Sequence, residues 1–438
     1  MTTGAADRLG PLLERAFAGE LPIRVKAWDG SQVGPVDAPA VVLRSRRALR
    51  RLLWAPGELG LAQAYVAGDI DLEGDLADGL RRIWAIARGR KMPDVHLRGR
   101  RLLDGTRVAI RLGVLGPRPQ PPAAQARLAG ARHSRHRDRA AIAHHYDLSN
   151  EFYALVLDPE MVYSCGYWVG DPDDPAYTVA DAQLDKLDLI CRKLGLEPGM
   201  RLLDVGCGWG ALILHAAAHY GVSATGVTLS TRQHGFVRQR IHERGLTARV
   251  EVRLQDYREI DDVPYDRVAS IEMGEHVGEQ QYPLYAASLF RLLRPGGRLL
   301  LQQMSRGAKH PGGGAFIESY VAPDMHMRPV GHTLALIEAA GFEARDVEAM
   351  REHYVWTVRA WYDALERQWG AAVELVGEQQ ARVWRLYLVG SMLTFAENRM
   401  GVDQILAVKP LAGGASGMPR TRASSSATAA ASSLRPVL

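Results

Sequence analysis

The sequence has few cysteines and no long apolar run. Three cysteines, Cys165, Cys191 and Cys207, occur among 438 residues, and their spacing fits neither a disulfide framework nor a zinc site. The start of the chain, MTTGAADRLG, lacks a basic segment followed by an apolar one, so we expect no signal peptide. No stretch of about 18 apolar residues occurs, which excludes an ordinary membrane-spanning helix. These absences predict a cytoplasmic protein that would meet a membrane only peripherally, at its inner face.

The net charge of +5 is unevenly distributed. Residues 81–140 contain 16 Lys and Arg but 3 Asp and Glu, a balance of +13 against −8 for the remainder. Such a segment can attract an anionic membrane surface or nucleic acid, whereas an arginine-rich solvated linker is the alternative. We expect no nucleic acid as a partner, because aromatic-interleaved basic surfaces and reader motifs are absent.

Composition divides the chain into four parts. They are a small N-terminal α+β domain (1–85), a basic Pro/Arg-rich linker (86–132), a main domain (133–410) and a Ser/Ala-rich tail (411–438). Within the first part, residues 69–74 are typical of a turn. No internal repeat is present.

The main domain alternates strand and helix signals, which predicts a parallel sheet covered on both faces. The strands are expected at 201–205, 223–228, 250–254, 265–271 and 298–303, and the helices at 209–220, 231–244, 282–293 and within 355–401.

A glycine-rich turn follows the first of these strands. The segment Leu203-Asp204-Val205-Gly206-Cys207-Gly208-Trp209-Gly210 allows a tight turn and a close approach of the backbone to a ligand. No Gly-Lys-Ser/Thr follows, as a phosphate-binding loop would require. Asp204 would suit a ligand that carries an amine.

Further segments at suitable intervals resemble the class I S-adenosylmethionine methyltransferases. These are Gln255-Asp256-Tyr257 after the third strand, the strand end Ser270-Ile271-Glu272-Met273, and the turn Leu293-Arg294-Pro295-Gly296-Gly297-Arg298. The resemblance implies a Rossmann-like, mostly parallel seven-stranded α/β sheet with the cofactor across the strand ends. Gln255, Asp256 and Tyr257 would then read and pack the adenine. Most such enzymes end the second strand with a carboxylate, which is absent from Gly226-Val227-Thr228-Leu229-Ser230.

That segment, followed by Gln233, resembles the cyclopropane-fatty-acyl-phospholipid synthases and mycolic acid cyclopropane synthases. The segments His145–Tyr153, Tyr163-Ser164-Cys165 and Glu272–Gly278 resemble the same family, and the resemblance covers most of residues 20–400. It implies that Thr228 and Gln233 lie near S-adenosyl-L-methionine and that Tyr146, Tyr163 and Ser164 cover its methionine end. The N-terminal part resembles that of the phospholipid synthases, which the shorter mycolic enzymes lack.

The chemistry of this family is methyl transfer to a carbon–carbon double bond. The attack leaves a carbocation on the lipid chain, which aromatic faces can stabilise and a dry pocket protects from water. In the family a bound bicarbonate is thought to remove the proton that closes the ring. By resemblance its ligands here would be Cys165, Glu275 and Tyr354, while His276 is either a supporting residue or the start of a helix.

One departure bears on the product. Gln302 stands where the family has a histidine, and an amide can donate to an anion but cannot take a proton. We therefore expect transfer of a methylene carbon to an unsaturated phospholipid acyl chain to form a cyclopropane, with mid-chain methyl branching as the alternative. A small-molecule methyltransferase and a non-catalytic binding protein are the rivals. The oligomeric state is open, with a homodimer among the choices.

Overall fold

The computed structural model describes residues 4–17, 19–89, 107–126, 130, 133, 137, 149–309, 312–419 and 421. The chain forms two compact units. One comprises Met1–Ala126, Gly314–Val321 and Trp369–Leu393, and the other comprises Arg127–Gly313, Ala322–Gln368 and Thr394–Leu438. The first unit therefore includes two segments, Gly314–Val321 and Trp369–Leu393, that the sequence assigned to the main domain. Among the described residues, no helix has the length and apolar content that crossing a bilayer requires.

The first unit is built on a four-stranded sheet in the order β2-β1-β3-β4. Its strands are β1 (Arg24–Lys26), β2 (Gln32–Val33), β3 (Ala40–Leu43) and β4 (Ile70–Glu73). The accompanying helices are α1 (Ala5–Ala16), α2 (Arg46–Trp54), α3 (Glu58–Val66), α4 (Leu76–Gly89), α12 (Ala315–Tyr320), α15 (Trp369–Val376) and most of α16 (Glu378–Ala396). The turn predicted at 69–74 is wrong, because Ile70–Glu73 pairs antiparallel with β3 and places Ile70 opposite Leu43.

Part of the predicted linker also belongs to the core of this unit. Residues 107–111 are helical, and Ala109, Leu112 and Val114 are buried beside Leu43 and Ala48. The linker prediction is therefore wrong for residues 107–114, because their apolar side chains find partners that composition does not reveal. Most of the rest of the basic segment, and most of the Ser/Ala-rich tail, lies outside the described residues.

The second unit holds the seven-stranded sheet that the resemblance implied, in the order β10-β11-β9-β8-β5-β6-β7. Five neighbouring strands run parallel, and β11 is antiparallel to both of its neighbours. The bounds are β5 (Arg201–Val205), β6 (Ser223–Thr228), β7 (Val250–Leu254), β8 (Tyr265–Ile271), β9 (Leu293–Ser305), β10 (Glu343–Ala349) and β11 (Gly401–Val408). The predicted bounds of the first four are confirmed.

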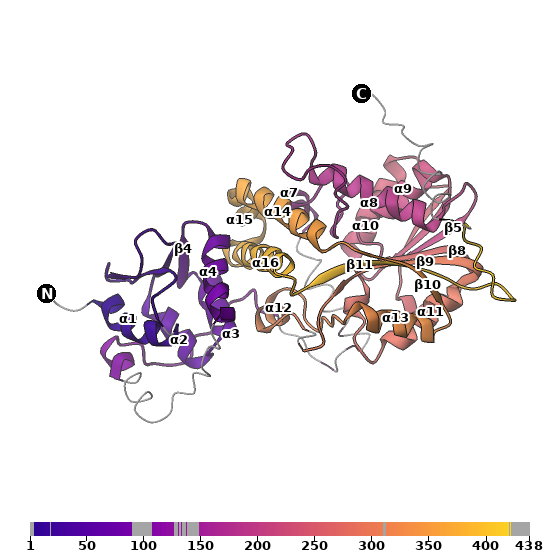
Figure 1. Ribbon diagram of the computed structural model, residues 1–438. Helices are drawn as coiled ribbons and strands as arrows, with labels where there is room; N and C mark the ends of the chain where they lie inside the picture. The colour runs from indigo at the N-terminus through magenta and orange to yellow at the C-terminus, as the bar shows by residue number, and fades with distance from the viewer. Residues whose placement is uncertain are drawn as a thin grey trace. The chain divides into compact units, whose positions relative to one another are not determined.

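Helices cover both faces of this sheet (Figure 1). One face carries α8 (Val179–Leu194), α9 (Ala211–Tyr220) and α10 (Thr231–Glu243), and the other carries α11 (Tyr282–Leu292) and α13 (Val330–Ala339). Leu202 packs in the core beneath α8, α9 and α10, and Leu203 packs in the core beneath α11 and α13, as the alternation of side chains along a strand requires. The helices α7 (Asn150–Val156) and α14 (Arg351–Arg367) complete the unit. This arrangement leaves the carboxyl ends of the parallel strands as the place for a site.

Candidate active site

The glycine turn after β5 has the backbone that its sequence predicts. Gly206, Gly208 and Gly210 have φ values of 84°, 54° and 82°. A Cβ atom on Gly206 would lie 2.8 Å from Cγ of Met273, so a side chain is excluded there on two grounds. Gly210 forms the N-cap of α9.

A cavity opens at the carboxyl ends of β5, β6 and β8. Nine of the predicted cofactor residues line it in addition to Asp204, and these are Tyr163, Ser164, Gly206, Gly208, Thr228, Gln233, Gln255, Asp256 and Tyr257. Gly210 lies just behind the lining, between Trp209 and Ala211, which both face the cavity. Tyr146 lies outside the described residues. The sequence therefore brings one continuous set of side chains to a single cavity.

Asp204 faces this cavity with an unused acceptor. Its side chain is buried, and Oδ1 has no hydrogen-bond partner. Burial raises the pKa of Asp204 to about 7, although the nearby Lys186 opposes the shift. A buried carboxylate oxygen without a partner is costly, and a ligand ammonium group would satisfy it.

The end of β6 is closed by amide and hydroxyl groups. Thr228 Oγ1 donates to Gln233 Oε1 at 2.7 Å, and both side chains are buried. Ser230 caps α10 by accepting from the Gln233 backbone N–H at 3.2 Å. The cap fixes Gln233 beside Thr228. The amide oxygen of Gln233 is thus occupied, and its NH₂ group is left as a donor at the cavity wall.

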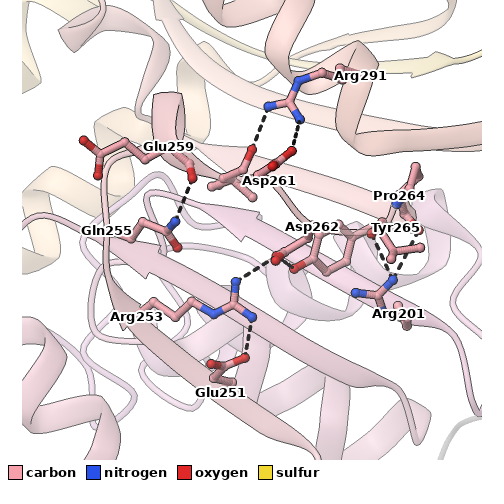
Figure 2. Close-up of polar contacts among 12 residues, drawn as sticks. Arg201, Glu251, Arg253, Gln255, Glu259, Asp261, Asp262, Pro264, Tyr265 and Arg291 are labelled. Carbon is pink, nitrogen blue, oxygen red and sulfur yellow. Dashed lines mark hydrogen bonds and ion pairs between the residues drawn. The ribbon is translucent and has the colours of Figure 1, made fainter.

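The loop after β7 holds the predicted adenine-binding residues. Gln255 Nε2 donates to the Glu259 carbonyl at 3.0 Å, and Arg253 joins Glu251 to Asp262 beneath this loop (Figure 2). The carboxylate of Asp256 accepts two hydrogen bonds from the Arg258 guanidinium, at 2.8 and 2.6 Å. These contacts hold the loop rigid, and they leave the Asp256 carboxylate largely engaged within the protein.

Glu272, in the cavity lining, is the centre of an acceptor site that the sequence did not single out. Its Oε1 accepts from the Cys165 backbone N–H at 2.8 Å and from Gln302 Nε2 at 2.8 Å. Its Oε2 accepts from the Tyr354 hydroxyl at 2.6 Å. Two of the three expected bicarbonate ligands, Cys165 and Tyr354, thus already bind a carboxylate that belongs to the chain, and Gln302 joins them.

The backbone of Glu272 is strained. Its φ is 51°, in the left-handed region that favours glycine, and it lies directly after β8. Such a conformation costs a non-glycine residue of order 1–3 kcal/mol and is found most often at functional sites. The three hydrogen bonds to the carboxylate offset this cost and fix its position.

A relay of amides orients Gln302. Gln302 Oε1 accepts from Gln404 Nε2 at 2.9 Å, and Gln404 Oε1 accepts from Lys193 Nζ at 2.9 Å. Gln302 and Gln404 are register partners on β9 and β11. Because Lys193 can only donate, each amide in turn must present its NH₂ group toward Glu272.

Glu275 lies near Glu272 and has a different environment. Its side chain is buried, and Oε2 has no hydrogen-bond partner, while Oε1 lies 3.4 Å from the Met304 backbone N–H. Burial and the negative charge of Glu272 raise the pKa of Glu275 to about 8. Of the two carboxyls, Glu272 is the one whose hydrogen bonds favour ionisation, so Glu275 carries the proton at neutral pH.

The remaining predicted residues have clear places. His276 lines the cavity, and burial lowers its pKa to about 4, so the imidazole is neutral. The Cys165 thiol lies 3.3 Å from the Gly166 carbonyl, and burial raises its pKa well above the ordinary value. The part of Cys165 that contacts Glu272 is therefore its backbone N–H, whereas the thiol packs.

Lys186 is a second residue that sequence reasoning missed. It is buried in the cavity wall, and its Nζ donates to Ser164 Oγ at 2.7 Å. Burial lowers the pKa of Lys186 to about 8, and Glu272 and Asp158 oppose that shift. Its place on α8 gives no local signal, whereas the glutamate at the end of β8 could have been noticed.

Comparison with known proteins places the chain in a family. Residues 133–405 match the family described as mycolic acid cyclopropane synthetase. The chain belongs to this family. It is 37% identical over 412 residues to a probable fatty acid methyltransferase of Pseudomonas putida, covering 92% of this chain and 95% of that protein. It is also 37% identical to the cyclopropane-fatty-acyl-phospholipid synthase of Escherichia coli, covering 60% of this chain and 67% of that protein.

A solved structure agrees with this membership. The mycolic acid cyclopropane synthase CmaA1 complexed with SAH and CTAB is 32% identical, with a TM-score of 0.57, and the match covers 61% of this chain and 97% of that chain. The protein is accordingly an S-adenosylmethionine-dependent methyltransferase of the lipid-modifying family, with the class I fold. S-adenosylmethionine supplies a methyl group on a sulfonium centre.

The cavity fits that methyl donor. Asp204, with its unpartnered Oδ1, would hold the amine, and the glycine turn would admit the backbone of the methionine portion. Ser164, Tyr163, Tyr257 and Gln255 line the same cavity. No group of three or more metal-ligating side chains occurs within the described ranges.

Proposed function

We propose that this protein methylates the double bond of an unsaturated fatty acyl chain and leaves a methylene or methyl branch rather than a cyclopropane. The observation that carries this proposal is the carboxylate of Glu272, held by Tyr354, Gln302 and the Cys165 N–H. These donors would otherwise be available to a bicarbonate ion. The long match to the Pseudomonas putida fatty acid methyltransferase supports the same product class.

Aromatic side chains beside the cavity suit a cationic intermediate on the acyl chain. Trp209, Tyr153, Tyr163 and Trp361 follow one another with ring centroids 4.5, 5.6 and 5.2 Å apart. Their faces attract positive charge without supplying a nucleophile that would trap it. Tyr163 and Trp209 line the cavity itself.

The proton balance follows from the acyl cation. Attack of the double bond on the methyl group leaves positive charge on the neighbouring carbon. A hydride shift moves that charge to the methyl-bearing carbon. Loss of a methyl proton to a carboxylate then gives a methylene branch on the acyl chain. Glu272 would accept this proton, because one of its four lone-pair positions remains unused by the three donors.

Ring closure is the second candidate. It is favoured by the match to the Escherichia coli phospholipid synthase, and it uses the same cation. The difference is the step that follows, since a methyl proton must then be lost before any hydride shift. The substrate, in either case, is proposed to be an unsaturated phospholipid acyl chain.

Product analysis tests the choice. The full chain is expressed in a bacterium that lacks its own cyclopropane synthase, with methionine deuterated on its methyl group, and fatty acid methyl esters are analysed. A cyclopropane and a methylene branch are isomers, so proton NMR of lipids made with unlabelled methionine must accompany mass spectrometry of the labelled ones. We expect a methylene branch that keeps two of the three deuterons, and reduction by a hydride donor of the host would convert it into a methyl branch. A cyclopropane product would contradict branching, and an unchanged lipid profile would contradict the lipid substrate.

A further inference from the structure

One surface of the first unit combines exposed apolar side chains with arginines. It is formed by α2 and residues 107–118, and we call it the α2 surface. The sequence has no Asp or Glu at residues 46–57 or 107–126. Arg46, Arg111 and Arg118 are exposed there. The charge contributed by these two segments is therefore entirely positive.

Hydrogen bonds join the two segments into one surface. The Arg50 guanidinium donates to the carbonyls of Val114 and Leu115 at 2.9 and 3.2 Å. Trp54 Nε1 donates to the Gly116 carbonyl at 3.1 Å. These bonds fix α2 against the 113–116 turn, so the two segments lie side by side.

Four large apolar side chains of the α2 surface are exposed to solvent and are not part of the core of the unit. Leu53, Trp54, Ile110 and Leu115 are 51%, 52%, 60% and 54% exposed. Isolated exposed apolar residues are ordinary, but four large ones on two bonded segments form a group. A group of this kind, interspersed with arginines, has the composition of an interfacial membrane contact.

We propose that the α2 surface docks onto the anionic face of a phospholipid bilayer. Arginine guanidinium groups match lipid phosphates, tryptophan favours the interface, and leucine and isoleucine side chains enter the boundary with the acyl chains. The inference rests on the proposed function in one respect, because an acyl chain in a phospholipid must be reached from a membrane surface. It identifies the partner as the membrane and names the residues that contact it.

Vesicle sedimentation tests the docking with the full chain. The probe is a vesicle of saturated phosphatidylglycerol and phosphatidylcholine, compared with phosphatidylcholine alone, at low and high salt. We expect binding to the anionic vesicles that weakens as salt rises. Arg46→Glu with Arg118→Glu should weaken binding at least about thirtyfold, since each arginine near an anionic surface contributes about 1 kcal/mol. Leu53→Gln with Ile110→Gln and Leu115→Gln should weaken it severalfold at both salt concentrations.

A matched control uses exposed apolar residues of the second unit. Val263 and Leu284 are 74% and 51% exposed, and Val263→Gln with Leu284→Gln should leave vesicle binding unchanged. Circular dichroism melting checks that each variant is folded. Wild-type binding by folded α2-surface variants would overturn the proposal, as would retention on nucleic acid without binding to vesicles. Saturated lipids offer no double bond, so this result stands apart from the outcome of the product analysis.

Discussion

Glu272 and Gln302 meet across two neighbouring parallel strands, with Gln302 Nε2 donating to Glu272 Oε1 at 2.8 Å. Gln302 stands where the resemblance implies a histidine, and the Glu272 carboxylate accepts hydrogen bonds from the Tyr354 hydroxyl and the Cys165 N–H, residues that the resemblance assigned to an external anion. The departure at Gln302 is therefore explained by the carboxylate that it contacts. Gln302 supplies a neutral N–H donor to this carboxylate.

Replacing Glu272 with glycine should open an anion site. Glycine adopts a φ of 51° without strain, and Tyr354, Gln302 and the Cys165 N–H would be left without their shared acceptor. We expect Glu272→Gly to lose at least about a hundredfold in kcat and to recover activity when bicarbonate or formate is added. Steady-state rates across a titration of each anion measure the effect.

Glu272→Gln is the matched control for that experiment. It keeps the volume of the side chain, so added anions have no space to bind, and the loss of kcat should persist. Affinity for S-adenosylhomocysteine, measured by calorimetry, should change little in both variants. Equal anion rescue of the two variants, or wild-type turnover by either, would remove Glu272 from its proposed role.

The Tyr354 hydroxyl should set the pH at which Glu272 becomes active. Its hydrogen bond stabilises the ionised carboxylate and lowers the pKa of Glu272 against the larger, opposing effect of burial. Tyr354→Phe removes this bond, so the pKa of Glu272 should rise and the acidic limb of the kcat profile should move to higher pH. A hydrogen bond to a charged group contributes about 1.5–3 kcal/mol, which corresponds to about ten- to a hundredfold in rate. A reduced rate with an unmoved acidic limb would indicate a packing role alone.

The sequence predicted the sheet and the cavity far better than this catalytic arrangement. β5 to β8 are short strands that alternate with helices, and their bounds follow from the sequence. The glycines of the β5 turn indicate its conformation without reference to any distant residue. Glu272 stands within two recognisable segments, a strand end and Glu272–Gly278, but its role depends on Tyr354 and Gln302, which are distant in sequence. A hydrogen bond between residues 82 positions apart leaves no local pattern.

The same reasoning explains the missed elements of the fold. β10 reads EARDVEA, which is polar enough to pass for an exposed loop, and its strand character comes from pairing with β11. β11 follows the stretch predicted as helical, 355–401, and its strand was not predicted. In the first unit, β4 is four residues long and contains two acids, and only its pairing with β3 makes it a strand.

The amide relay predicts a distant effect of Gln404. Gln404→Leu removes the donor that fixes Gln302 Oε1, so the Gln302 amide can turn and present its oxygen to the Glu272 carboxylate. We expect kcat to fall about tenfold, the effect of one misplaced hydrogen bond of about 1.4 kcal/mol, with cofactor affinity unchanged. The neighbouring Asp403→Asn is the control, because Asp403 bonds Ser305 on the same two strands. If the double variant with Gln302→Leu shows the product of the two single losses, the residues do not act as a relay.

Binding of the methyl donor should depend on the charge of Asp204. Burial raises the pKa of Asp204 to about 7, and only the ionised form can pair with the donor amine. Affinity for S-adenosylhomocysteine should therefore rise by up to about tenfold per pH unit below pH 7 and level off above it. Calorimetric titrations between pH 5.5 and 7.5 measure this slope.

Asp204→Asn should bind the donor weakly and without that slope. The folded pKa lies above the ordinary value of 3.8, so Asp204 favours the folded state in acid and loses this contribution as pH rises through about 7. The asparagine variant has no such loss, and without ligand its melting temperature relative to wild type should be higher at pH 8 than at pH 5. A wild-type affinity that stays flat across this range, or falls as pH rises, would show that the donor amine does not pair with Asp204.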